Sequence, residues 1–332
     1  MLSFRACLLS AAGLVVLLPC ALRGASHTCT RQRSASRALL DTGRGTGLRH
    51  GRPYPRGEPL LSEPAFVVHD LRRRVDGWSV AETENFQIFH NQKPGLVAQV
   101  ARVAERTRLA MHRKWFGDAP EVWRPRCKIY LHATYRKYLR QTGVKGAEGH
   151  ALIRLDGGQV DSRSIHAYCT APNLLQDVVP HEVTHAVLAG HFGAHNVPRW
   201  ADEGIALLSQ PRDSIEEFVG VLPGHREDDD LFAAEILMTT EDTTLTNTVE
   251  FYGQSVSLVD FLVTWKGPQA FTEFLWDSFH TDYERALKRH YGLRGFADLD
   301  QRWQAYAFGE GPPPEGFVRA FPGRLETRRG AN

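Results

Sequence analysis

Two histidines and a glutamate in one short stretch of the sequence have the spacing of a metal site. His181, Glu182 and His185 form the pattern H-E-x-x-H within "PHEVTHAVLAGHFGAHNVPRWADEGIALL", residues 180–208. On a helix, residues four apart differ by about 40° in direction, so both imidazoles can reach one ion. Glu182 lies about 100° from His181, where its carboxylate can act as a base beside the ion. The pattern therefore predicts metal-assisted hydrolysis, with Zn²⁺ suited to the two imidazoles.

A catalytic zinc ion usually takes three protein ligands and keeps a fourth position open, so a third ligand is needed. His191 has the spacing of the longer pattern H-E-x-x-H-x-x-G-x-x-H, but Leu188 stands where that pattern has its glycine. Leucine favours a continued helix, which would turn His191 about 240° away from His185. His191 is therefore a weak candidate for the third ligand.

Glu203, in "RWADEGIALL", is the favoured third ligand. Pro198 is well placed to start a second helix there, because proline is favoured in the first helical turn. The small residues Gly204 and Ala206 would allow this helix to approach the H-E-x-x-H helix closely. The alternatives for the third ligand are His191, Asp202 and His195.

The elements that must position these residues follow from periodicity. Alternating apolar residues predict strands over 84–90 and 127–132, and a hairpin formed by 150–156 and 164–169 with "GGQVD" between them. A helix is predicted over 93–117. After Asn173 the pattern is helical throughout, over 174–190, 198–209, 254–266, 268–279, 282–291 and 296–307. Strands followed by helices predict an α+β fold with a small mixed sheet and a mostly helical C-terminal half.

The two ends of the chain differ from this middle. Residues 1–25 contain Arg5 followed by the apolar run "LLSAAGLVVLLPCAL", the layout of a signal peptide, which predicts export. A lipoprotein anchor at Cys20 or an uncleaved membrane tether is the less favoured alternative. Residues 26–76, rich in arginine and glycine, are predicted to be a flexible linker, and 309–332 a flexible tail. The folded domain is expected over 77–308.

Composition excludes one class of function and leaves a redox question open. Forty basic and 38 acidic residues give a formal net charge of +2, which argues against nucleic-acid binding. Beyond the predicted signal, Cys29, Cys127 and Cys169 remain. A Cys127–Cys169 disulfide is permitted in an oxidising compartment, and two buried free thiols fit the sequence equally well.

The order of these motifs resembles a known family. "HEVTH" followed by "PRWADEGIA" is similar to the gluzincin branch of zinc peptidases, and the wider order resembles the peptidase MA-like domains of exported bacterial proteins. The resemblance covers about residues 80–308. It implies a zincin-like fold, zinc held by His181, His185 and Glu203, and Glu182 as general base. The aminopeptidase pattern has its glutamate one residue further along, so the resemblance carries no aminopeptidase specificity.

The resemblance also implies a donor for the developing oxyanion, a tyrosine downstream of the ligand glutamate. Tyr252, in "FYGQSVSLVDFL", is the candidate, with Arg199 and His280 as weaker alternatives. Packing of Tyr252 at the start of a helix is an equally good interpretation of that residue.

These observations predict an exported zinc metallopeptidase acting on a peptide or protein substrate. The substrate would lie along an edge strand of the 150–169 hairpin, since an extended peptide can add to an exposed edge. One alternative is a non-catalytic envelope binding or scaffold protein that keeps the fold. Another is a zinc amidase that cleaves a non-peptide amide of the cell wall.

Overall fold

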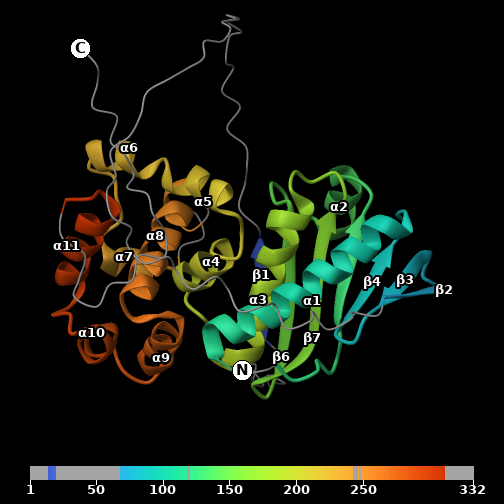
Figure 1. The fold of residues 1–332 in the computed structure, drawn as a ribbon, viewed down its shortest axis with the longest axis horizontal. Helices are drawn as coiled ribbons and strands as arrows, with labels where there is room; N and C mark the ends of the chain where they lie inside the picture. Colours follow the sequence, from blue (N-terminus) through green and yellow to red (C-terminus); the bar gives the residue numbers. More distant parts are fainter. Residues whose placement is uncertain (1–13, 20–67, 118–119, 242–245, 247, 311–332) are drawn as a thin grey trace, which may run out of the picture. The chain divides into compact units, whose positions relative to one another are not determined.

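The computed structural model describes residues 14–19, 68–117, 120–241, 246 and 248–310 (Figure 1). Most of the predicted signal peptide, most of the predicted linker and nearly all of the predicted tail lie outside the described residues. Among the helices in the described ranges, none is both long enough and apolar enough to cross a membrane.

The strands form one mixed sheet. In chain order they are β1 (Leu14–Pro19), β2 (His69–Val75), β3 (Trp78–Glu82), β4 (Phe86–His90), β5 (Cys127–His132), β6 (Gly149–Asp156) and β7 (Gln159–Tyr168). Their order across the sheet is β1-β6-β7-β5-β4-β3-β2. β5 pairs in parallel with both β4 and β7, and the other neighbours are antiparallel.

Two helices lie among the strands and the remaining helices follow them. In chain order these are α1 (Pro94–Phe116), α2 (Tyr135–Thr142), the π-helix η1 (Leu174–Val178), α3 (Val179–Phe192), α4 (Arg199–Leu207), α5 (Arg212–Val219), α6 (Leu222–Glu227), α7 (Ala234–Thr239), α8 (Val249–Lys266), α9 (Pro268–Ser278), α10 (Tyr283–Tyr291) and α11 (Phe296–Ala307). The α+β class predicted from the sequence is confirmed, and the sheet is mixed as expected.

Local sequence explains where several elements begin and end. α1 starts at Pro94 and stops at Gly117, whose φ of 78° is the left-handed conformation that glycine adopts at helix ends. The side chain of Thr248 accepts a hydrogen bond from the backbone N–H of Phe251, which caps α8. Gly157 and Gly158 join β6 to β7 with φ values of 56° and 82°, as a tight hairpin turn requires.

α1 and α3 pack on one face of the sheet, where the apolar core lies (Figure 1). The strand residues on this face alternate with outward residues and are fully buried or nearly so; they include Ile88, Ile129, Leu131, Ala151, Ile153 and Ile165. Burial of this continuous apolar layer stabilises the packing of α1 and α3 on the sheet.

The opposite face of the sheet carries a row of stacked rings. Phe89, Tyr130, His166 and His150 are cross-strand neighbours on β4, β5, β7 and β6, and successive ring centroids are 4.7, 4.6 and 5.0 Å apart. His132 adds Nε2 at 3.1 Å from His166 Nδ1. We call His132, His150 and His166 the sheet histidines. Tyr138 of α2 covers them, with its hydroxyl 2.7 Å from His150 Nδ1.

Several details differ from the sequence-based expectations. β2 begins at His69, inside the range expected to be linker, and β1 lies inside the range expected to be signal peptide. β7 starts at Gln159 rather than residue 164, and α8 at Val249 rather than residue 254. Cys127 and Cys169 are both free, so the alternative of a disulfide between them does not hold. Burial raises the pKa of the Cys127 thiol to about 12, so this thiol is unreactive.

Candidate metal centre

α3 brings the H-E-x-x-H residues into the interior of the molecule. The π-helical turn of η1 runs directly into α3, and Pro180, which has no N–H, lies in the first turn of α3. The H-E-x-x-H motif therefore lies at the start of α3. His181, Glu182 and His185 are all 0% exposed. Three polar side chains buried this completely require partners, because an unpaired buried polar group is costly.

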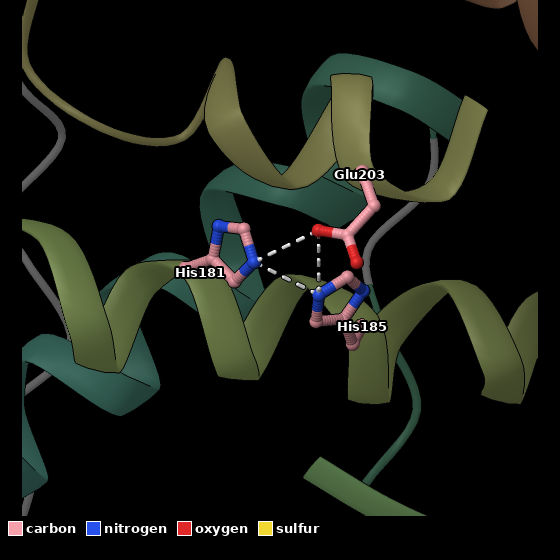
Figure 2. A group of neighbouring side chains, drawn as sticks. All are labelled: His181, His185 and Glu203. Carbon is pink, nitrogen blue, oxygen red and sulfur yellow. Dashed lines mark hydrogen bonds and ion pairs between the residues drawn. The ribbon is translucent and has the colours of Figure 1, made fainter. Parts of the chain in front are cut away.

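Glu203 completes a group of three potential ligands. Figure 2 shows its carboxylate from α4 pointing at the two imidazoles of α3. His181 Nε2 lies 3.0 Å from His185 Nε2 and 3.3 Å from Glu203 Oε2, and the third side, from His185 Nε2 to Glu203 Oε2, is 3.8 Å. This buried group could hold a metal ion, and it is the one group of three such residues found within the described parts of the chain.

The spacing of the three atoms fits a small metal ion. An ion bonded tetrahedrally at about 2.0–2.1 Å separates its ligand atoms by about 3.3–3.4 Å. The three observed distances span that value. Two imidazole nitrogens and one carboxylate oxygen also form a donor set that borderline divalent metals favour.

The other histidines considered as third ligands lie elsewhere. The His191 ring stacks on Phe116 with centroids 3.5 Å apart, and His195 packs against Phe279 with centroids 5.0 Å apart. The continued helix at Leu188, expected from the sequence, turns His191 away from the group. Asp202 contacts the site without joining the three ligands: its Oδ2 lies 3.0 Å from His185 Nδ1.

Gly204 has a different role from the one predicted. A Cβ at this position would lie 2.5 Å from Val259 Cγ2 and 2.8 Å from the Ser255 carbonyl oxygen, both on α8. The glycine therefore permits close approach of α4 to α8, not to α3. This contact fixes the helix that carries Glu203 against α8.

The charges around the group also suit a divalent cation. Three carboxylates, of Glu182, Asp202 and Glu203, lie near the imidazoles, and one guanidinium, that of Arg199, has its Nη2 3.3 Å from Glu203 Oε1. With both imidazoles neutral and the carboxylates ionised, this cluster carries a net charge of −2. A buried net charge is costly without a counter-ion, and a divalent metal would neutralise it.

Without a metal, protons bound to the cluster neutralise part of its negative charge. Burial alone would lower the pKa of His185, but Asp202 outweighs it, with help from Glu203 and Glu182, and the pKa rises to about 9. For His181 burial prevails and its pKa is lowered. Burial raises the pKa of Glu203, but the hydrogen bond from His181 and the charges of His185 and Arg199 reverse this, so the pKa falls below its usual range.

Glu182 occupies a separate position beside the ligands. Burial, together with the charges of Glu203 and Asp202, raises its pKa well above the ordinary value, against the opposing effect of His185. Neither carboxylate oxygen has a well-formed hydrogen bond to the described residues. β6 approaches it closely: a Cβ on Gly149 would lie 3.3 Å from Glu182 Cγ. Glu182 is thus a poorly solvated carboxyl group beside the ligands and next to the sheet.

Tyr252 and Arg199 form the wall behind Glu203. Arg199 Nη2 donates to the Tyr252 hydroxyl at 3.0 Å, and its Nε donates to the Thr246 carbonyl at 3.2 Å. Tyr252 is thereby linked to the ligand group through one guanidinium. His280, the other candidate oxyanion donor, instead packs with His195 and Trp276.

One contact was missed entirely by sequence reasoning. Gln210 lies just beyond α4, and its Nε2 is 3.2 Å from His181 Nδ1. No motif or periodicity points to this residue. Arg199 was considered only as an oxyanion donor, and its contact with Glu203 at the i,i+4 spacing of α4 was detectable from the sequence.

Comparison with known proteins adds no further assignment: no protein-family model matches the chain, and no curated protein shows significant similarity to it.

Proposed function

We propose that this chain is an exported zinc-dependent peptidase with a zincin-like fold. The observation that carries the proposal is the buried His181–His185–Glu203 group with the carboxyl group of Glu182 beside it. The resemblance of "HEVTH" and "PRWADEGIA" to gluzincin peptidases supports the same function. Export is supported by the signal-like pattern of residues 1–25.

The ligand set is His181, His185 and Glu203. These residues would hold a zinc ion, which would supply Lewis acidity to polarise the carbonyl group of the scissile bond and lower the pKa of water toward neutrality. Three protein ligands leave room for a fourth, as catalytic zinc sites require.

Glu182 accepts a proton from the attacking water and transfers it to the leaving amine. The base must be ionised to do so, and a divalent positive charge beside it opposes the effect of burial on its pKa. The position of Glu182 supports this role, because its buried carboxyl group lies beside the three potential ligand atoms without being one of them.

Tyr252 stabilises the oxyanion that develops on the carbonyl group. Arg199 donates to the phenol oxygen, which makes the phenol a stronger donor. Arg199 also neutralises part of the charge on Glu203, and its contact holds the ligand carboxylate in place.

The test compares the full wild-type chain with Glu182→Gln. Both are assayed for zinc by mass spectrometry and for new peptide amines released from a mixture of denatured proteins. We expect about one zinc per chain in both, and hydrolysis lower by about 10²–10⁴-fold in the variant. Glu216→Gln, on the exposed face of α5, is the matched control and should retain full activity.

Two results would contradict the proposal. Full hydrolysis by Glu182→Gln would remove this residue from the mechanism. Zinc binding by the wild type without hydrolysis of any component would favour the non-catalytic alternative.

A further inference from the structure

The two ligand histidines have different partners on their outer ring nitrogens. Nδ1 of His185 faces the carboxylate of Asp202 at 3.0 Å, and Nδ1 of His181 faces the amide of Gln210 at 3.2 Å. Both Nε2 atoms point toward the space that they share with Glu203. The contact of Asp202 with His185 is explained by its position next to Glu203 in α4, whereas Gln210 lies outside that helix.

A histidine that binds a metal through Nε2 must carry its proton on Nδ1, and that proton needs an acceptor. A carboxylate only accepts hydrogen bonds, but an amide presents an oxygen that accepts and a nitrogen that donates. In the structure Gln210 presents Nε2 to His181 Nδ1, which suits an imidazole with its proton on Nε2. A half-turn about the terminal side-chain bond presents Oε1 and suits the opposite tautomer, the one that binds metal.

The backbone holds Gln210 at this place from two sides. Its N–H donates to the Leu207 carbonyl at 3.0 Å, which anchors it to the end of α4. Pro211, the next residue, caps α5. Ser214 of α5 donates to Asp177 at 2.9 Å, and Asp177 belongs to η1, which leads directly into α3. The start of α5 is therefore tied to the same helical path that carries His181.

We propose that Gln210 is a positioning residue for His181, with its amide oxygen accepting the Nδ1 proton when the site holds metal. The inference rests on the proposed function, because it assumes that His181 is a ligand. The inference assigns a role in metal binding to a residue that lies outside both the H-E-x-x-H motif and α4. It also accounts for the residue type, since the amide can satisfy either tautomer of His181.

The experiment measures zinc affinity of the full chain by competition with a chromophoric chelator. Gln210→Met keeps the length of the side chain and removes the acceptor, and we expect zinc affinity to fall by about 10–100-fold. Gln210→Glu keeps an acceptor at the same place and should bind zinc at least as tightly as the wild type. Gln254→Met is the matched control: Gln254 is buried and bonded to the backbone of Phe232, away from the ligands, and its loss should leave zinc affinity unchanged.

A second readout is the Nδ1–H proton of His181 in the zinc-loaded chain, observed by ¹⁵N-edited NMR. It should exchange slowly with solvent in the wild type and in Gln210→Glu, and rapidly in Gln210→Met. Wild-type affinity in Gln210→Met would overturn the inference and leave the peptidase proposal intact, as would equal weakening in Gln210→Met and Gln210→Glu. Failure of the wild type to bind zinc would overturn the peptidase proposal itself.

Discussion

The protein buries two groups of histidines in opposite chemical surroundings. His181 and His185 lie on α3 among three carboxylates, whereas the sheet histidines lie among aromatic rings and the Tyr138 hydroxyl. The pKa of His185 is raised to about 9, and burial lowers those of His150 and His166 to about 4 and about 3. Both groups are buried, but carboxylates raise the pKa of His185, whereas burial and neighbouring histidines lower the pKa values of His150 and His166.

This difference shows why a cluster of histidines is not by itself a metal site. His132 and His166 have ring nitrogens 3.1 Å apart, nearly the separation found between His181 and His185. Within the described residues, however, the group able to hold an ion is the one that includes Glu203, and a divalent ion at the sheet histidines would add charge where burial already lowers the pKa values of the rings. The sheet histidines therefore act as neutral rings that pack and exchange hydrogen bonds.

The largest difference between the two groups of histidines should be the effect of their substitution on zinc binding. We expect His181→Ala to reduce zinc affinity by more than the roughly 100-fold attributed to loss of an outer contact, because one of three ligands is lost. His166→Phe should retain about one zinc per chain, since its ring is outside the ligand group. Mass spectrometry and chelator competition measure both. Zinc loss in His166→Phe would indicate that the metal binds at the sheet histidines and not at His181, His185 and Glu203.

The next largest effect should be the change in the free energy of unfolding with pH. Unfolded histidines bind protons near pH 6.5, whereas folded His150 and His166 stay neutral down to about pH 4 and about pH 3. The unfolded chain therefore holds more protons between these limits, and the free energy of unfolding rises with pH from about 3 to about 6.5. Each histidine contributes at most about 1.4 kcal/mol per pH unit.

Urea unfolding of the wild type and His166→Phe across this range, with a chelator present in both, measures the effect. The slope of stability against pH should be smaller in the variant. Identical slopes would mean that His166 does not stay neutral in the folded chain, and the contrast with His185 would disappear.

A smaller effect should come from the packing behind Glu203. Gly204→Ala would force α4 away from Val259 and Ser255 of α8, and we expect a loss of about 1–3 kcal/mol in the free energy of unfolding together with weaker zinc binding. Gly224→Ala, where no atom lies within 4 Å of the added Cβ, is the control. If Gly204→Ala keeps full stability and zinc affinity, the metal site does not depend on helix spacing.

The smallest effect should be that of His191→Ala. This histidine belongs to neither group and stacks on Phe116, so its loss should cost about 0.5–1.5 kcal/mol and leave zinc affinity unchanged. Thermal unfolding and chelator competition test the two parts separately. Weaker zinc binding would revive the longer H-E-x-x-H-x-x-G-x-x-H pattern.

The ligand group was accessible to sequence reasoning because helical spacing brings residues four apart onto one face. Leu188 correctly indicated that the helix continues past the motif, and Pro198 that a second helix carries Glu203. The β6–β7 hairpin was also predictable from its glycine turn. These features depend on local geometry, which the residue order determines directly.

Other features depend on contacts between distant segments. β2 has the sequence "HDLRRRV", with little apolar alternation, and forms by backbone pairing to β3 at the edge of the sheet. α2 is largely polar and has only 8 residues, with Tyr138 as its buried residue, so the segment is too short for its helical period to be recognised in the sequence. Gly204 faces α8 and Gln210 faces His181 for the same reason: the partner is determined only when the chain has packed.

The three potential ligands all lie within residues 181–203, on two helices that adjoin in sequence and in space. The parallel pairs of β5, in contrast, join segments from Phe86 to Tyr168. Closing a short loop costs less conformational entropy than assembling distant strands, and it happens sooner. A metal ion held by the α3–α4 pair would therefore be a cross-link within one local segment and would add little constraint to the pairing of the distant strands.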